Sequence, residues 1–418
     1  MFFDDALVAS KELEITLTGK SCGLEERAPM CGIPYHAVEG YLSKLVSRGY
    51  KVAICEQVED PKLAKGLVKR EVIRVVTPGT NLNVQSLEAG KNNYLLSIAY
   101  TPDGIGISAA DVTTGDYYVT EVEDLKKLND ELMKYEPSEI ICNEAFLVSG
   151  FDVNDLKSRL HISVNALESH MFDDDGCRRI LMKHFKVNTL IGLGVEEFPT
   201  GLLAAGALLQ YLYDTQKTDL EHFTHIYPYL TSKYMLLDSS TRRNLELTET
   251  LREKQKRGSL LWVLDKTKTA MGARLLRNYI EQPLIEKDEM EKRLDAIQEL
   301  NQDSISRDEI REYLNPIYDL ERLLSKVTYK TANPRDLIAF RNSLKMLPPI
   351  KTVLSAFEKE ELTKIREQID GLEDIYQLID EAIIDEPPLS IREGGMIKDQ
   401  IDETIDTLRR AKHDGKQW

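Results

Sequence analysis

The amino-acid sequence predicts a multidomain protein in which two α/β domains are followed by an all-helical one. Three observations lead to this prediction. The chain has 418 residues, which is too long for one ordinary domain. Short segments with strand and helix patterns alternate through the first part of the chain. From Glu221 onward nearly every segment has the spacing of apolar residues that an α-helix requires.

Residues 1–80 are predicted to form the first α/β domain. Helices are expected where apolar residues recur on one face, and strands where β-branched residues cluster. The predicted order is helix Asp4–Leu13, strand Ile15–Thr18, turn Gly32–Tyr35, helix Ala37–Arg48, and strands Lys51–Gln57 and Glu71–Thr77. The dipeptide Pro78-Gly79 predicts a turn that ends this domain.

Residues 81–92 are polar and without a clear period, so they are predicted to be a linker. The second domain, residues 93–220, starts with strands at Leu95–Tyr100, Gly104–Asp111 and Tyr117–Glu121. Helix Leu125–Tyr135, strand Glu139–Cys142 and a closing helix at Gly201–Tyr213 follow. Three antiparallel strands followed by a helix and a strand are how an RNase H-like fold begins, so this α/β domain is predicted to be RNase H-like.

Residues 221–418 are predicted to be all-helical. The segment Tyr234–Leu284 is expected to form a helix, a charged loop and a second helix, with Ser239-Ser240 as a candidate cap for the first helix and Thr269 for the second. Asn333 is expected to cap a helix that begins at Pro334. Further helices are predicted at residues 284–301, 307–326, 335–355, 360–370, 373–384 and 397–410, with a stop at Pro387-Pro388.

Charge is distributed unevenly along the chain. The net charge of −16 argues at first against nucleic acid, but binding to DNA needs only a local positive surface. Residues 41–80 hold eight basic and four acidic residues, a net charge of +4, and residues 241–280 hold ten and four, a net charge of +6. Residues 351–418 hold ten basic and seventeen acidic residues, a net charge of −7. Helix faces in contact with water are the alternative explanation for both basic segments.

The sequence predicts a cytoplasmic protein. No apolar run approaches the roughly 20 residues that span a bilayer, and acidic residues stand at the N-terminus where a secretion signal needs basic ones. The five cysteines form no CxxC pair. Reduced and mostly buried thiols are therefore expected.

Two motifs that suggest catalysis fail on inspection. Gly19-Lys20-Ser21 has the ending of a phosphate-binding loop, but Glu14 stands where that loop needs a further glycine. Asp111 lies at the end of a predicted strand, where RNase H-type nucleases hold metal ions. Nothing in the sequence makes Glu144 or Asp173–Asp175 converge on it. Asp111 is instead predicted to accept hydrogen bonds in the Thr-Thr-Gly turn that follows.

Three long stretches carry a family resemblance. They are PMCGIPYHAVEGYLSKLVSRGYKVAICEQVEDP and VKREVIRVVTPGT within Pro29–Thr80, LDSSTRRNLELTE and GSLLWVLDKTKTAMGARLLRNYIEQPL within Tyr234–Leu284, and DLERLLSKVTYKTANPRDL at Asp319–Leu337. They closely resemble the MutS family of bacterial DNA mismatch-repair proteins, and they occur in that family's order over most of the chain.

The resemblance implies a function and partners. Residues 1–80 would be the mismatch-binding domain, residues 93–220 the connector, and residues 221–418 the helical core with the start of the lever. Family members recognise mispaired or looped duplex DNA. They act as homodimers that signal by ATP binding and hydrolysis, with magnesium, to MutL, which docks partly on the connector. No membrane partner is implied.

The resemblance also implies a chain that is incomplete at both ends. The family's Phe-x-Glu motif, whose Phe wedges beside the mispaired base, would precede Met1; Phe2 and Phe3 are not assigned its role. The clamp and ATPase domains would follow Trp418. The chain itself is therefore expected to bind no cofactor and to have no enzymatic activity. It is expected to bind matched and mismatched duplex weakly and equally.

Five residues are the candidate DNA contacts. By their position in the family's pattern, Lys69, Arg70 and Lys20 are expected to contact phosphates, which position a duplex without reading its sequence. Tyr35 and His36 lie in the GIPYH turn; they either hold the turn or contact DNA directly. Two alternatives to mismatch repair remain: a MutS paralogue or interaction scaffold that binds branched DNA, and an RNase H-like nuclease.

Overall fold

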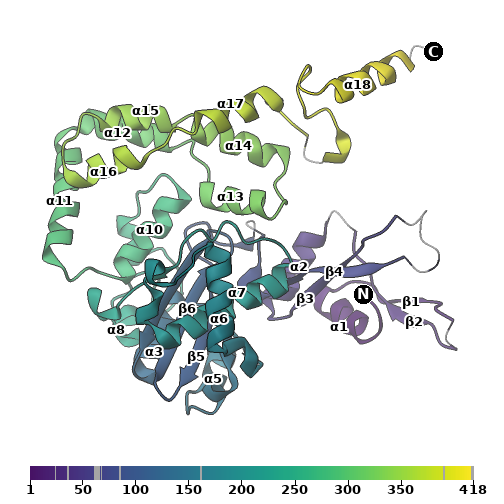
Figure 1. The fold of residues 1–418 in the computed structure, drawn as a ribbon, viewed down its shortest axis with the longest axis horizontal. Coiled ribbons are helices and arrows are strands. Elements are labelled where there is room, and N and C mark those ends of the chain that lie inside the picture. Colours follow the sequence, from purple (N-terminus) through teal and green to yellow (C-terminus); the bar gives the residue numbers. More distant parts are fainter. Residues whose placement is uncertain are drawn as a thin grey trace. The chain divides into compact units, whose positions relative to one another are not determined.

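A computed structural model describes residues 1–23, 25–34, 37–60, 66, 68–83, 86–160, 162–388 and 391–415. The chain forms two compact units. The first contains Met1–Ser232 with Leu237–Thr241, and the second contains Lys233–Leu236 with Arg242–Trp418. Within the first unit, we call residues 1–80 the ribbon domain and residues 93–232 the sheet domain. The second unit is called the helical unit (Figure 1).

The ribbon domain consists of two helices and two separate antiparallel strand pairs. Its elements are α1 (Phe3–Leu13), β1 (Thr18–Lys20), β2 (Ala28–Met30), α2 (Val38–Ser47), β3 (Val52–Gln57) and β4 (Arg70–Val76). Strand β1 pairs with β2, and β3 pairs with β4. The apolar side of α1, with Ala6, Ala9 and Leu13, packs against Cys31 and Leu45. Both predicted helices and the last two predicted strands are confirmed.

Two details of the ribbon domain differ from the sequence prediction. The strand expected at Ile15–Thr18 is found at Thr18–Lys20, because Glu14 ends α1 in a left-handed conformation and residues 15–17 only lead out of that turn. Strand β2 was not predicted. It has three residues, and Pro29, which cannot donate a hydrogen bond to a neighbouring strand, is one of them.

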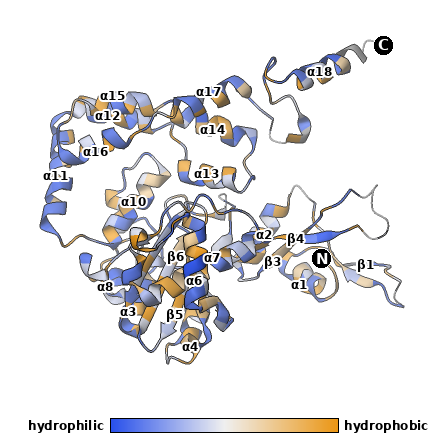
Figure 2. Ribbon diagram, viewed as in Figure 1, coloured by the Kyte–Doolittle hydropathy of each residue, from blue (hydrophilic) through white to orange (hydrophobic). Residues whose placement is uncertain are grey.

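The sheet domain has a six-stranded mixed sheet in the order β10-β7-β6-β5-β8-β9. Its strands are β5 (Leu95–Thr101), β6 (Gly104–Asp111), β7 (Asp116–Val122), β8 (Glu139–Asn143), β9 (Ser163–Leu167) and β10 (Tyr227–Pro228). Its helices are α3 (Leu125–Tyr135), α4 (Glu144–Leu147), α5 (Val153–Arg159), α6 (Asp174–Phe185) and α7 (Pro199–Gln216). Figure 2 shows that hydrophobic residues concentrate in the strands. The strands and helices predicted for residues 93–220 are confirmed.

Strand β10 places residues 221–232 with the first unit. We expected the helical part to begin at residue 221, but Tyr227 and Pro228 pair in parallel with Tyr118 and Val119 of β7. Thr120 Oγ1 also donates a hydrogen bond of 2.7 Å to the carbonyl of Tyr229. These contacts extend the sheet by one strand and move the boundary between the units toward residue 232.

Helix α7 lies directly against the sheet because Gly106 has no side chain (Figure 1). A Cβ atom at Gly106 of β6 would come within 1.9 Å of the carbonyl oxygen of Thr200. The carboxylate of Glu121 accepts hydrogen bonds from the backbone N–H groups of Thr200 and Gly201, which are otherwise unpaired at the start of a helix. The sequence thus fixes both the depth and the position of α7.

The described part of the helical unit contains helices and no strand longer than an isolated bridge. Its helices are α9 (Leu260–Leu264), α10 (Ala270–Glu281), α11 (Lys287–Gln302), α12 (Ser304–Leu314), α13 (Leu320–Thr328), α14 (Pro334–Leu344), α15 (Leu347–Leu354), α16 (Glu360–Gln368), α17 (Glu373–Ala382) and α18 (Glu403–Gly415). Helix α8 (Ser239–Asn244) spans the boundary between the two units. The prediction that the last part of the chain is helical is confirmed for the described residues of the helical unit.

Two of the three predicted helix caps are confirmed. Thr269 accepts a hydrogen bond from the backbone N–H of Gly272 at 3.0 Å, and Asn333 accepts one from Asp336 at 2.9 Å. The serine pair is not the cap of α8. Asp238 Oδ1 accepts the backbone N–H of Thr241 at 2.6 Å instead, since a carboxylate is the stronger acceptor at the positive end of a helix.

Two predicted helices are each broken in two. The segment 307–326 is divided between α12 and α13, because Pro316 cannot continue a helix and Asp319 caps a new one. The segment 335–355 is divided between α14 and α15 just before Pro348 and Pro349. The apolar residues keep helical spacing across both breaks, but the prolines end the helices there.

A buried arginine joins α10 to α13. Arg274 is 3% exposed. Its Nη1 and Nη2 donate to the two carboxylate oxygens of Asp319 at 2.8 and 2.7 Å, and Nη2 also donates to Glu321 at 2.6 Å. These partners raise the pKa of Arg274, against the opposing effect of burial. The arginine is therefore a structural cation.

We predict that Arg274→Met destabilises the helical unit by about 3–5 kcal/mol, because removal of one partner leaves a poorly solvated carboxylate. Lys254→Met is the matched control. It removes an exposed pair with Glu249 and is expected to cost less than about 1 kcal/mol. Trp262 lies in the helical unit, so tryptophan fluorescence during urea unfolding measures the effect. Equal midpoints for the two variants would contradict the prediction.

The buried His222 should make the stability of the sheet domain depend on pH. Burial lowers the pKa of His222 from 6.5 to about 4, so the folded protein binds this proton less readily than the unfolded chain. Above about pH 6.5 this histidine does not reduce the free energy of unfolding. As the pH falls from 6.5 toward 4, the unfolded chain takes up the proton first, and the free energy of unfolding decreases by up to about 3 kcal/mol. Urea unfolding followed by tyrosine near-UV circular dichroism should show this loss in the wild type and a smaller one in His222→Gln. The exposed His170 provides the control variant His170→Gln, which should behave like the wild type.

Candidate nucleic-acid interface

The candidate phosphate contacts Lys69 and Arg70 lie at one end of the β3–β4 pair. Arg70 is the first residue of β4 and pairs with Gln57, the last residue of β3. Both basic residues are exposed. The carbonyl of Lys69 accepts the N–H of Val58 at 3.1 Å, and the N–H of Lys69 donates to Glu59 at 2.5 Å. Hydrogen bonds to the end of β3 and to the two residues after it therefore fix the backbone of Lys69 and Arg70.

Acidic neighbours partly neutralise this end of the ribbon. Lys69 Nζ lies 2.5 Å from Glu71 Oε1, and the two side chains are 66% and 52% exposed. An ion pair this exposed contributes little to stability. A phosphate can therefore replace Glu71 as the partner of Lys69 at small cost.

Lys20 lies on the other strand pair of the ribbon domain. It is the last residue of β1 and pairs with Ala28. Its Nζ is 5.8 Å from the ring centroid of Phe2. The structure thus brings Lys69 and Arg70 together and holds Lys20 on a separate element. Tyr35 and His36 lie outside the described residues.

Other basic residues of segment 41–80 have structural roles. Arg48 pairs with Glu12. Lys51 is directed to Glu139 of the sheet domain, with 3.3 Å between Nζ and Oε1. Both residues contribute to the net charge of +4 of segment 41–80, and nothing in the local sequence reveals that Lys51 has a partner so distant in the chain. The positive surface is accordingly smaller than the net charge suggests.

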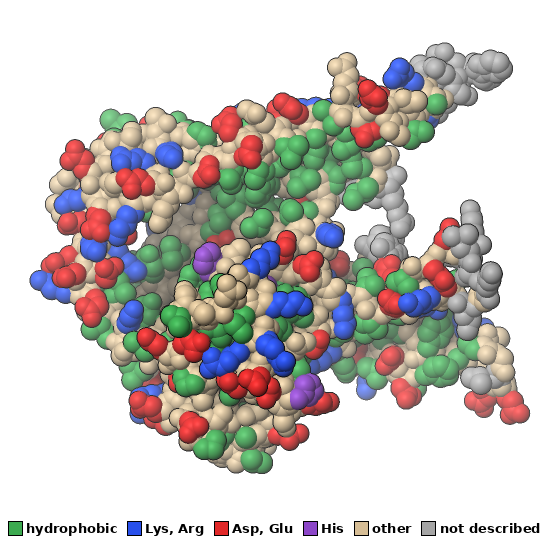
Figure 3. All heavy atoms as spheres, viewed as in Figure 1, with side chains coloured by type: hydrophobic (Ala, Val, Ile, Leu, Met, Phe, Trp, Pro, Cys, Tyr) green, Lys and Arg blue, Asp and Glu red, His purple; other side chains and the backbone are tan. Residues whose placement is uncertain are grey.

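Four of the ten basic residues of segment 241–280 pair with acidic residues. Besides Arg274, Arg277 pairs with Glu281 at 3.1 Å, Lys254 with Glu249 at 3.0 Å, and Lys256 with Asp265 at 2.5 Å. Figure 3 shows acidic and basic side chains interspersed over the face of the chain that it draws. We propose no DNA contact in segment 241–280.

Asp111 is surrounded by hydrogen-bond donors. It is fully buried. Its Oδ1 accepts the N–H and hydroxyl of Thr113 at 2.8 and 2.7 Å, and its Oδ2 accepts Asn92 Nδ2 at 3.0 Å and the N–H of Asn93 at 2.9 Å. The predicted role as an acceptor in the turn is confirmed. No cluster of metal-binding side chains occurs among the residues that the structure describes.

Two of the acidic residues considered as partners of Asp111 have other roles. Asp173 accepts the N–H of Gly176 at 3.0 Å and so caps α6, while Asp174 pairs with Arg178 at 2.8 Å. The Gly19-Lys20 dipeptide lies in strand β1, and residues 21–23 and 25–27, which the structure describes, form no helix.

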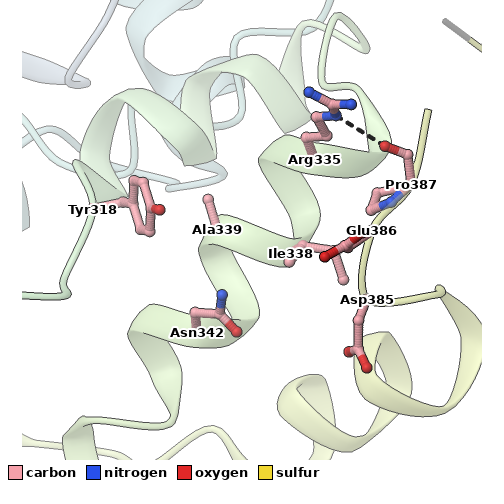
Figure 4. Close-up of a pocket in the computed structure, with 8 residues that line it drawn as sticks. All are labelled: Tyr318, Arg335, Ile338, Ala339, Asn342, Asp385, Glu386 and Pro387. Carbon is pink, nitrogen blue, oxygen red and sulfur yellow. Dashed lines mark hydrogen bonds between the residues drawn. The ribbon is translucent and has the colours of Figure 1, made fainter. Parts of the chain in front are cut away.

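One cavity of about 370 Å³ lies in the helical unit, and no candidate residue lines it (Figure 4). Residues of α14 and of the segment after α17 line it together with Tyr318. Arg335 Nε donates a hydrogen bond of 2.9 Å to the carbonyl of Pro387, which fastens that segment to α14. Its lining mixes acidic, basic and apolar groups, and we assign it no ligand.

Models of three consecutive domains of one family match the chain. A model of MutS domain I matches residues 1–85, one of MutS domain II matches residues 93–224, and one of MutS domain III matches residues 240–414. The matches follow one another in the family's order over nearly the whole chain. The chain belongs to the MutS family, whose members are multidomain proteins.

Individual relatives agree with this assignment. The chain is 64% identical over 418 residues to the protein named DNA mismatch repair protein MutS from Lachnoclostridium phytofermentans. It is 51% identical over 421 residues to the protein of that name from Ruminiclostridium cellulolyticum. Each alignment covers 100% of this chain but 45% and 48% of the respective relative. The chain spans about half the length of the curated relatives it matches. None of the described helices is long and apolar enough to cross a membrane.

We predict that Asp111→Asn destabilises the sheet domain by about 1–3 kcal/mol, because an amide nitrogen would face groups that themselves donate hydrogen bonds. Hydrogen exchange of the β6–β7 peptide measures this effect. The exposed Asp103→Asn variant is the control and should leave exchange unchanged. Magnesium-dependent cutting of duplex or RNA–DNA hybrid that is lost in Asp111→Asn would instead show that the residue is catalytic.

Proposed function

We propose that this chain acts in DNA mismatch repair and that its ribbon domain contacts duplex DNA through phosphates. Membership in the MutS family and the name shared by its relatives support the first part. The second part is supported chiefly by one observation: Lys69 and Arg70 stand exposed and adjacent at the far end of the β3–β4 ribbon. Lys20, Tyr35 and His36 remain further candidate contacts.

Such an interface positions a duplex without identifying its bases. Lysine and arginine contacts to phosphate release counterions, so affinity falls steeply as salt rises. Phosphates are the same at a matched and a mismatched pair, so these contacts carry no information on sequence. Discrimination of a mispair is the task of other groups in the family, whose wedge unstacks the base step.

The sheet domain would serve as the connector that MutL contacts. Its strand order supports an RNase H-like fold: β5 lies between antiparallel β6 and parallel β8, β7 follows β6, and β9 follows β8. In the full-length family ATP and magnesium drive the signal and two subunits associate. We propose the same for the whole protein, acting on DNA in the cytoplasm.

We predict that Lys69→Ala/Arg70→Ala weakens binding to matched and mismatched duplex by the same factor. The slope of log affinity against log salt should also become shallower, by about 0.9 for each phosphate that the variant no longer neutralises. Fluorescence anisotropy with two duplexes that differ at one base pair, measured over a series of salt concentrations, gives both quantities.

Arg179→Ala/Lys183→Ala is the matched control, since it removes one arginine and one lysine from the exposed side of α6. It changes the net charge equally and should leave the salt slope at the wild-type value. Weakening by the ribbon variant that is confined to the mismatched duplex would refute phosphate contact at Lys69 and Arg70.

A further inference from the structure

The carboxylate of Glu139 is buried where the ribbon domain meets the sheet domain. Glu139 is the first residue of β8, and none of its surface is exposed. A carboxylate withdrawn from water needs several donors and a countercharge to remain stable. Four groups supply them, and they come from both domains.

Two donors belong to each domain. From the ribbon domain, Lys51 Nζ lies 3.3 Å from Oε1, and the N–H of Gly79 donates to Oε2 at 3.2 Å. From the sheet domain, Tyr211 OH and Asn165 Nδ2 donate to Oε1 at 2.8 and 3.1 Å. Lys51 Nζ also donates to Tyr211 OH at 3.0 Å. Lys51 is therefore the countercharge, and it is shared between the carboxylate and α7.

The turn that carries Gly79 fits closely against the sheet domain. A Cβ atom at Gly79 would lie 2.8 Å from Cβ of Leu95 and 3.1 Å from Cβ of Glu139. The turn is fixed by the hydrogen bond from the N–H of Thr77 to Thr80 Oγ1, 2.9 Å long. Asn93 Nδ2 donates to the carbonyl of Pro78 at 3.1 Å. A rigid turn thus enters a site that only glycine can occupy.

These contacts favour one angle between the two domains. Apolar surfaces can slide against each other with little change in energy. A buried carboxylate cannot, because any other angle would keep the charge buried and remove Lys51 or the N–H of Gly79 from reach. The hydrogen bonds are directional and set the angle, while the apolar contacts around them supply area.

We propose that Glu139 is a positioning residue for DNA binding. This proposal rests on the phosphate contacts proposed above. Lys51 directly precedes β3, and the Gly79 turn directly follows β4, so the joint holds both strands at their Val52–Val76 end. Arg70 lies at the opposite end. At about 3.3 Å per residue the ribbon is roughly 20 Å long, so a rotation of about 10° at the joint moves Arg70 by about 3 Å.

A distance measurement in solution tests the joint. The exposed Cys55 on β3 and Lys157→Cys on the exposed side of α5 carry spin labels in a Cys22→Ser background. Cys31, Cys142 and Cys177 are buried. The wild-type joint should give one narrow distance distribution. Glu139→Gln and Lys51→Met should each widen or shift it.

Two further variants complete the comparison. Gly79→Ala forces the turn out of its site without changing charge, and it should reproduce the effect. Lys91→Met removes an exposed pair with Glu136 and should leave the distribution unchanged. If Glu139→Gln does not fold by circular dichroism, Lys51→Met and Gly79→Ala still decide the matter. A wild-type distribution in both of them overturns the proposal.

Duplex binding by the same proteins separates this inference from the proposed function. A loss of affinity in Lys51→Met and Gly79→Ala, for matched and mismatched duplex alike, supports the positioning role. Unchanged affinity with an altered distance distribution refutes that role. A wild-type chain that binds no duplex refutes the proposed phosphate contacts, and the distance distributions then still test whether Glu139 fixes the joint.

Discussion

The organisation of the first unit depends on a charge that neither of its domains can neutralise alone. Without the ribbon domain, Glu139 would keep two neutral donors, Tyr211 and Asn165, and no cation. With it, Lys51 and the N–H of Gly79 complete the set. The Lys51 side chain is 36% exposed, and an ion pair of this kind adds little net stability compared with apolar packing. The contribution of the pair is therefore to specify one arrangement.

The helical unit uses the same device between two of its helices. Arg274 on α10 meets Asp319 and Glu321 at the start of α13, and the bidentate geometry sets the rotation of one helix relative to the other. Asp319 also caps α13, since it accepts the N–H of Arg322 at 3.3 Å. One aspartate thus ends the break after Pro316 and orients the helix that follows it.

Local patterns predicted most of the fold, and contacts between distant residues limited the rest. Strand β6 and helix α3 were predicted to the residue because turn signals bound them. Strand β2 is too short to have a pattern, and β10 exists only because β7 offers a free edge. In the candidate site, Lys69 and Arg70 are exposed, and their contact with phosphates stays a prediction. The role of Lys51 could not be predicted, because Glu139 is distant in sequence and no local signal connects them.

The short range of electrostatic forces explains how an acidic chain can present the DNA interface proposed above. At physiological salt, charges more than about 8 Å apart are largely screened, so the net charge of −16 acts weakly on a duplex held at the ribbon. What matters is the charge within a few ångströms of the phosphates. There, Glu71 and Glu59 lie beside Lys69, and Arg70 is the next residue along the chain. Such a small group of cations is effective only if it is held in place. The placement of the ribbon, rather than total charge, therefore decides whether these contacts form.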